Sequence, residues 1–219
     1  MNGKRPLSPD EQVRLLSSLQ SQGRHRDFLF VLTGLRTGYR ARELLSIQLK
    51  HFLVAGKIGR EISLPRRNMK FGRGQLAHTV SGRRVAIHPE LRAALETYLA
   101  QHFPGTHDPE TFLFPNPRTG RPISVVQAWR MFTSACHEVS IYERIGLHST
   151  RKSFAKACHS ITRDLVRTQG LLQHRSPLST VRYLESALDD LDNIVCGLPG
   201  LPAPVALTTS VSPGTVAAA

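Results

Sequence analysis

The stretch LTGLRTGYRARELLSI, residues 32–47, carries the pattern Thr-Gly-x-Arg twice, ending first at Arg36 and then at Arg40. A glycine that ends one helix shortly before the next begins creates a bend, and a bend can direct an arginine inward. Arg40 is followed at the third position by Glu43 and then by apolar residues, whereas Arg36 has Tyr39 at that offset. The pattern therefore favours Arg40 as the inward arginine, oriented by Glu43. An ordinary Arg–Glu pair one helical turn apart would give the same pattern.

Around this stretch the sequence predicts a mainly α-helical fold with a small antiparallel β-sheet, in the α+β class. Ser8 followed by Pro9 is typical of a helix start, and apolar residues then recur at helical spacing. Residues 52–88 alternate β-forming residues with glycine-rich turns, which predicts the sheet. Further helical patterns begin near residues 26, 41 and 89, and cover about 124–139, 149–160, 163–173 and 177–194.

The composition indicates a folded, strongly basic chain. Of its 219 residues, 40% are hydrophobic, which predicts a globular domain and not a disordered segment. Lys and Arg number 29 against 16 Asp and Glu, giving a formal net charge of +13. This excess favours a polyanionic partner, because cations bound along phosphates release counterions. Ribosomal proteins, membrane-surface proteins and DNA enzymes share such an excess, so charge alone leaves all three classes open.

Cysteine usage and hydropathy indicate the compartment. None of the three cysteines lies in a CxxC pair, which argues against a disulfide framework or a zinc ribbon and fits a reducing cytosol. The first residues lack the apolar stretch of a signal peptide. No apolar run approaches the roughly 18 residues that a membrane span needs. We therefore expect a cytoplasmic protein without a membrane partner.

Three further stretches contain side chains that could take part in phosphate chemistry. His148 and Arg151 lie three residues apart, hence on one helical face, where an imidazole and a guanidinium can bind a phosphate together. His174 precedes Tyr183 by nine residues, and Lys70 lies between a β-like segment and a glycine-rich turn. Each signal has an ordinary alternative: a capping histidine beside a surface arginine, a core tyrosine, or one more lysine on a basic protein.

In their order along the chain, these segments resemble the boxes of the tyrosine site-specific recombinases, the phage-integrase family. The resemblance covers about residues 8–194. It rests on TGYRAREL at 37–44 as the TGxRxxEL box, Lys70 as the hairpin lysine, HSTR at 148–151 as the HxxR box, and HRSPLSTVRY at 174–183 as the box with the tyrosine. It implies the fold of the tyrosine recombinase catalytic domain.

Two departures from the family pattern accompany the resemblance. Gln173 stands before His174, where the family usually has a glycine, and this could alter the close packing of the turn. The segment between Lys70 and the sequence SGRRVAIH at 81–88 is also longer than a tight hairpin. The assignment of the lysine therefore depends on a less regular pattern than the other boxes do.

The resemblance implies DNA cleavage and rejoining through a covalent 3′-phosphotyrosine intermediate. Tyr183 would attack the scissile phosphate and release a 5′-hydroxyl, and a 5′-hydroxyl of another strand would reseal the bond. In the register of the TGxRxxEL box the arginine is Arg40. Arg40 and Arg151 would bind the non-bridging oxygens and stabilise the transition state, with a further hydrogen bond from His174.

The same resemblance assigns the proton transfers to two other side chains. His148 would accept the proton of the tyrosine, and Lys70 would protonate the departing 5′-oxygen. No cofactor or metal ion is expected, because cationic side chains take the place of a metal in this chemistry.

The implied organisation is a catalytic domain at 1–195 followed by a flexible tail at 196–219, without an N-terminal core-binding domain. The expected partners are double-stranded DNA, copies of the same chain in a homotetramer on synapsed DNA, and accessory DNA-bending proteins. We therefore expect the protein on the bacterial nucleoid. The sequence LESALDDLDNIV at 184–195 is amphipathic enough to dock on a neighbouring subunit, or equally on its own domain.

The sequence leaves three other functions open. A type IB topoisomerase would use the same side chains to relax supercoils, but it normally needs a larger clamp around DNA. A non-catalytic DNA-binding accessory protein could keep the fold without the reaction, although all six candidate groups are present. A basic RNA-binding protein would fit the composition but would leave the order of the boxes unexplained.

Overall fold

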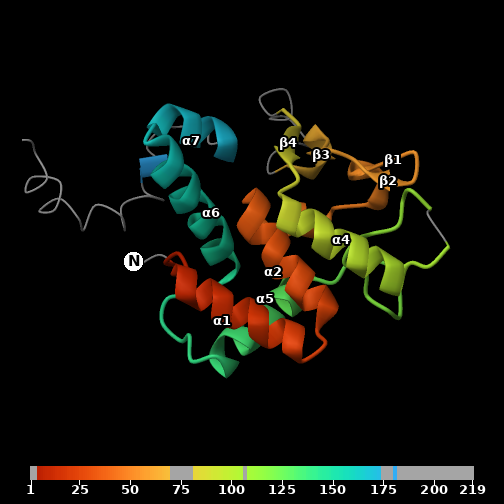
Figure 1. The fold of residues 1–219 in the computed structure, drawn as a ribbon, viewed down its shortest axis with the longest axis horizontal. Helices are drawn as coiled ribbons and strands as arrows, with labels where there is room; N and C mark the ends of the chain where they lie inside the picture. The colour runs from red at the N-terminus through yellow and green to blue at the C-terminus, as the bar shows by residue number, and fades with distance from the viewer. Residues whose placement is uncertain (1–3, 70–80, 106–107, 174–179, 182–219) are drawn as a thin grey trace, which may run out of the picture. The chain divides into compact units, whose positions relative to one another are not determined.

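The structure is a computed structural model, which describes residues 4–69, 81–105, 108–173 and 180–181. Its α-helices are α1 (Pro9–Ser21), α2 (His25–Thr37), α3 (Ala41–Leu45), α4 (Pro89–His102), α5 (Val125–Glu138), α6 (Leu147–Thr162) and α7 (Leu165–Leu172) (Figure 1). The short 3-10 helices are η1 (Leu49–His51) and η2 (Arg66–Asn68). The strands are β1 (Leu53–Val54), β2 (Lys57–Ile58), β3 (Glu61–Leu64) and β4 (Arg83–Ala86).

Helix α1 begins at the predicted signal. The Ser8 hydroxyl accepts a hydrogen bond from the backbone N–H of Glu11, and the Glu11 carboxylate accepts one from the backbone N–H of Ser8. This capping box satisfies two of the N–H groups that a helix start leaves without an intrahelical partner. Leu15 and Leu19, four residues apart on one face, are fully buried.

Helix α2 is the central element of the described fold. It contacts α1, α4, α5 and α6, and Figure 1 shows it among them. Residues 29–35 are all buried, so this helix has no solvent-facing side over that length. Its buried hydroxyls are satisfied within the helix: Thr33 donates to the Leu29 carbonyl and Thr37 to the Thr33 carbonyl, each at 2.6 Å.

The predicted single sheet is divided into two separate two-stranded antiparallel ribbons. One pairs β1 with β2, and the other pairs β3 with β4 in the register Glu61↔Ala86 to Leu64↔Arg83. The second ribbon is attached to the end of α2 by Tyr39, whose buried hydroxyl contacts the carbonyls of Ile62 at 2.9 Å and Arg83 at 3.1 Å. Lys70 belongs to the connection between β3 and β4 and lies outside the described residues.

Two hydrophobic clusters lie on either side of α2. The larger cluster joins α2, α3, α4 and the strands, and within it the rings of Phe30 and Phe114 meet edge to face with centroids 5.2 Å apart. The second cluster joins α1 to α5 and includes Leu15, Phe132 and Ile141. Residues of the α2 helix belong to both clusters, so its position fixes the two halves of the core together.

The prediction of a mainly α-helical fold with a small antiparallel β-sheet is confirmed, with the β-structure present as two ribbons. The predicted helix at 177–194 and the predicted tail at 196–219 lie outside the described residues, apart from 180–181. None of the helices in the described part of the chain is both long and apolar enough to cross a membrane.

Candidate active site

The turn between α2 and α3 places Arg40 against a buried carboxylate. Gly38 ends α2 with φ 61°, in the left-handed region that glycine adopts without strain. Arg40 immediately precedes α3, and its backbone N–H donates to Glu43 Oε2 at 2.8 Å while its Nη1 donates to Glu43 Oε1 at 2.8 Å. The Glu43 side chain is only 1% exposed. One buried carboxylate therefore caps the helix and fixes the direction of the Arg40 guanidinium.

The two glycines of the doubled pattern have different roles. Gly34 lies inside α2, where an added Cβ would approach the Thr150 hydroxyl to 2.8 Å. At Gly38 an added Cβ would overlap the ring of Phe154. Because the two glycines are one helical turn apart, as are Thr150 and Phe154, they allow α6 to pack closely along α2. This close approach brings the first turns of α6 against the Gly38 turn.

Arg151 on α6 joins two segments of the candidate site. Its side chain is buried, with an exposed fraction of 1%. Nη1 donates to the Gly38 carbonyl, and Nη2 donates to the carbonyl of Leu172, the last residue of α7, at 2.6 Å. Arg151 thus connects the turn that precedes Arg40 to the residue two positions before His174.

Arg36 is distinguished from Arg40 by its partner and not by its exposure. The two side chains are 33% and 27% exposed, a small difference. Arg36 forms an ion pair with Glu90 on α4, with 2.6 Å between Nη2 and Oε2. It is therefore directed toward α4, whereas Arg40 is held by the carboxylate of its own turn.

Of the remaining predicted site residues, only His148 lies within the described part of the chain. His148 lies in the first turn of α6, is exposed, and precedes the buried Arg151 by three residues. Lys70, His174 and Tyr183 lie outside the described residues. The structure therefore brings Arg40 and Arg151 to one turn, and the roles of all six side chains stay predictions.

Arg83 is a buried charge at this turn that our sequence analysis did not identify. It is 2% exposed, donates through Nη1 to the Gly38 carbonyl at 3.2 Å and through Nη2 to the Thr37 carbonyl at 2.6 Å, and lies 4.7 Å from the ring centroid of Tyr39. Burial lowers the pKa of the Arg83 guanidinium, and the nearby Tyr39 and Glu43 oppose this shift. The alternation of side chains along the strand sequence RRVAI, residues 83–87, could have indicated the burial of Arg83, because it places Arg83 on the inward face with Val85.

Gln173 takes the conformation that glycine would take in its place. Its φ is 49°, in the left-handed region at the end of α7. Its side-chain amide donates to the Gly82 carbonyl at 3.0 Å, which ties the end of α7 to the start of β4. The glutamine thus accepts some backbone strain and gains a contact that glycine cannot make.

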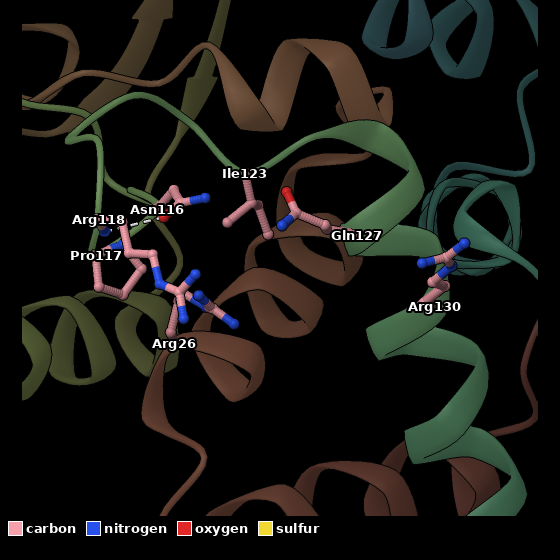
Figure 2. A pocket seen from close by; sticks show the side chains of 7 residues that line it. All are labelled: Arg26, Asn116, Pro117, Arg118, Ile123, Gln127 and Arg130. Carbon is pink, nitrogen blue, oxygen red and sulfur yellow. Dashed lines mark hydrogen bonds between the residues drawn. The ribbon is translucent and has the colours of Figure 1, made fainter.

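A second basic feature lies near the other end of α2. A pocket of about 430 Å³ is lined by the arginines Arg26, Arg118 and Arg130, together with Asn116, Pro117, Ile123 and Gln127. In Figure 2, Arg26 and Arg118 extend toward one another, and Arg130 lies further along α5. No carboxylate is among these lining residues, although Arg26 forms an ion pair with the neighbouring Asp27 at 3.0 Å. Within the described ranges there is no group of three or more His, Cys, Asp or Glu side chains that could hold a metal ion.

The chain matches the phage integrase family over residues 5–189. It belongs to that family. This member is 25% identical over 181 residues to the probable integrase/recombinase YoeC of Bacillus subtilis (strain 168), a match that covers 82% of this chain and 88% of that protein. Membership confirms the resemblance to this family. It also confirms the prediction of a tyrosine recombinase, an enzyme that cleaves and rejoins DNA.

Solved structures of tyrosine recombinases share the fold. XerA recombinase superposes with a TM-score of 0.68 at 22% identity, covering 89% of this chain and 66% of that chain. The post-cleavage complex of XerH with a palindromic difH substrate gives a TM-score of 0.66 at 21% identity, and the match covers 90% of this chain and 54% of that chain. A lambda integrase dimer bound to a COC′ core site gives a TM-score of 0.60 at 14% identity, and the match covers 84% of this chain and 48% of that chain. The integrase described here thus spans between about half and two thirds of these longer chains.

Proposed function

We propose that this integrase-family member breaks and rejoins duplex DNA at a specific site, with Tyr183 as the nucleophile. The observation that carries the proposal is the meeting of Arg40 and Arg151 at the turn around Gly38. Two guanidiniums held at one turn, one by a buried carboxylate and one by backbone carbonyls, form a preorganised cationic site for a phosphate.

The geometry suits stabilisation of a transition state more than loose anion binding. A guanidinium carries five N–H donors in a fixed fork. Glu43 accepts a hydrogen bond from one nitrogen of the Arg40 guanidinium, Nη1. Arg151 is buried, so the field of its charge is only weakly screened by water. Both groups keep their orientation before substrate binds, so little reorganisation is needed when charge builds up on the phosphate oxygens.

The other proposed roles complete the reaction. Tyr183 forms the phosphotyrosine and His174 donates a hydrogen bond to the phosphate. His148, in the first turn of α6, accepts the proton of the tyrosine. Lys70 protonates the leaving 5′-oxygen, and its segment starts directly after Met69, which is anchored in the core. We propose no metal ion or other cofactor for this site.

Duplex DNA is the proposed substrate, and the arginine-lined pocket is a proposed contact to its backbone. Among the structures that share this fold, XerH is bound to a difH substrate, lambda integrase to a core site, and the Tn1549 transposon integrase to transposon right end DNA. The 13 residues of α2 span about 20 Å between the Gly38 turn and the Arg26 end. That distance corresponds to about six phosphates along one strand at 3.4 Å each, so one short duplex is long enough to reach both places.

The wider assembly is also a proposal. It is a homotetramer on two synapsed sites, with accessory DNA-bending proteins, working on the bacterial nucleoid. The formal net charge of +13 supports association with DNA, because lysines and arginines that bind phosphates release the counterions held by the DNA.

The function can be tested with supercoiled plasmids that carry two candidate sites taken from the DNA around the gene. We expect recombinant products in the presence of magnesium chelators and without ATP. Relaxation of a plasmid that lacks the sites, without any recombinants, would favour a topoisomerase. DNA binding without either product would leave a non-catalytic accessory protein.

A further inference from the structure

The carbonyl oxygen of Gly38 accepts hydrogen bonds from two buried arginines. Arg151 reaches it from α6, and Arg83 reaches it from β4 at 3.2 Å. Arg83 also holds the preceding carbonyl, that of Thr37, at 2.6 Å. Both carbonyls belong to the last turn of α2, which leads directly into Arg40. The direction in which Arg40 leaves that turn is therefore fixed by side chains from two distant segments.

The strand that supplies Arg83 is itself fixed to this turn. The Tyr39 hydroxyl contacts the backbone carbonyls of Ile62 and Arg83, so the two ribbon strands and the turn share one side chain. The Arg83 guanidinium lies over the Tyr39 ring at 4.7 Å. Arg83 and Tyr39 thus contact each other through both backbone and side chain.

Arg83 also follows a segment that the proposed reaction needs. It begins β4, directly after the connection between Leu64 and Arg83 in which Lys70 lies. Its neighbour Gly82 accepts a hydrogen bond from Gln173, the residue before His174. One short stretch, Gly82 and Arg83, therefore contacts the turn before Arg40 and the turn before His174.

We propose that Arg83 is a positioning residue, which holds the Thr37–Gly38 turn so that Arg40 and Arg151 converge on the scissile phosphate. This inference rests on the proposed function, because it gives Arg83 a role only through those two arginines. In this role Arg83 does not itself contact the reacting atoms.

The electrostatic arrangement is difficult to explain by stability alone. Arg83 and Arg151 carry like charges, are buried at 2% and 1% exposure, and donate to the same oxygen. A buried charge is costly to desolvate, and an apolar side chain of similar volume is often at least as stabilising. Only a guanidinium has a rigid fork that can bond two successive carbonyls at once. Holding the turn in one geometry accounts for this choice of residue.

The test compares Arg83→Met with Arg83→Lys in the full chain. The substrate is a nicked duplex carrying the site, on which the cleaved strand cannot be rejoined. At saturating DNA, we expect Arg83→Met to slow single-turnover cleavage on the order of 10²-fold, as a displacement of about 1 Å would. Arg83→Lys, which cannot bond both carbonyls, should lose roughly 10-fold. The matched control is Arg84→Met, since the Arg84 side chain on the same strand is 74% exposed.

A double-mutant cycle separates positioning from general loss of structure. If Arg83 acts through the turn that carries Arg40, adding Arg83→Met to Arg40→Lys should slow cleavage further by less than about 5-fold. Fully multiplicative losses would contradict the inference. Thermal unfolding checks that each variant is folded at the assay temperature. If Arg83→Met is not folded there, Arg83→Lys is decisive, and a wild-type rate for it would overturn the proposal.

Failure of this inference can be distinguished from failure of the proposed function. If Arg40→Lys slows cleavage strongly and folded Arg83 variants cleave at the wild-type rate, only the positioning role is wrong. If Arg40→Lys and Tyr183→Phe both cleave at the wild-type rate, the proposed function itself is wrong.

Discussion

Glu43 holds Arg40 at two points, accepting its backbone N–H and its guanidinium Nη1, each at 2.8 Å. The same carboxylate is fully buried beneath the turn. The rotamer of a surface arginine is normally free to change, whereas this one is coupled to the start of α3. The pair thus converts a flexible side chain into a fixed donor for an anion.

Replacing Glu43 by Gln should show whether this coupling matters. The amide keeps the shape but loses the charge-assisted bond, so we expect cleavage to slow by about 10- to 100-fold while DNA binding changes little. The measurement is single-turnover cleavage at saturating DNA, beside a filter-binding Kd. Glu90→Gln, which alters the partner of Arg36, is the matched control. Equal effects of the two substitutions would contradict a special role for Glu43.

The register of the doubled pattern can be tested with the two arginines themselves. Arg40→Ala should reduce the cleavage rate by about 10²-fold or more, as the loss of an oxyanion donor does. Arg36→Ala removes a partly exposed ion pair and should change unfolding free energy by less than about 1 kcal/mol and cleavage little. A crippled Arg36→Ala beside an active Arg40→Ala would show that the register is wrong.

Substitutions at two glycines with similar backbone geometry can separate the effect of backbone strain from that of steric crowding. Gly38 and Gly56 have φ of 61° and 75°, but only at Gly38 would a Cβ meet another side chain, that of Phe154. We expect Gly56→Ala to lower the unfolding free energy by about 1 kcal/mol, the cost of a left-handed residue. Gly38→Ala should lower it by about 2–5 kcal/mol, because crowding adds to strain. Urea unfolding measures both, and equal losses would contradict the close packing of α6 on α2.

The arginine-lined pocket predicts a measurable salt effect. If Arg118 neutralises a DNA phosphate, Arg118→Gln should reduce the slope of log K against log salt by about 1. It should weaken binding to all sequences alike, because phosphates carry no sequence information. Titrations at several salt concentrations measure the slope, with the exposed Arg14 on α1 changed to Gln as the control. An unchanged slope in Arg118→Gln would exclude this contact.

Local signals in the sequence predicted local structure well. Ser8 and Pro9 indicated the start of α1, and Gly38 followed by Arg40 and Glu43 indicated the bend between two helices. Each of these patterns is completed within one or two turns, so the chemistry of neighbouring residues is sufficient to determine it.

Contacts between distant segments could not be predicted in the same way. The partner of Arg36 is Glu90, 54 residues away on α4, and the carbonyls that bind Arg83 are 45 and 46 residues away. In the sequence such an arginine cannot be distinguished from the other charged residues of a basic chain. Its burial and its partners are determined only when the strands and helices are assembled. The division of the predicted sheet into two ribbons has a similar origin, since the pairing of β3 with β4 spans the Lys70 segment.

The most direct test of Tyr183 as the nucleophile is the identity of the residue that becomes attached to DNA. The nicked duplex is incubated with the full chain, and the denaturation-resistant adduct is digested and mapped by mass spectrometry. We expect a nucleotide on the peptide that contains Tyr183, no adduct with Tyr183→Phe, and a normal adduct with Tyr142→Phe, a change at an exposed tyrosine. An adduct that persists in Tyr183→Phe, or that maps to another residue, would contradict this role of Tyr183.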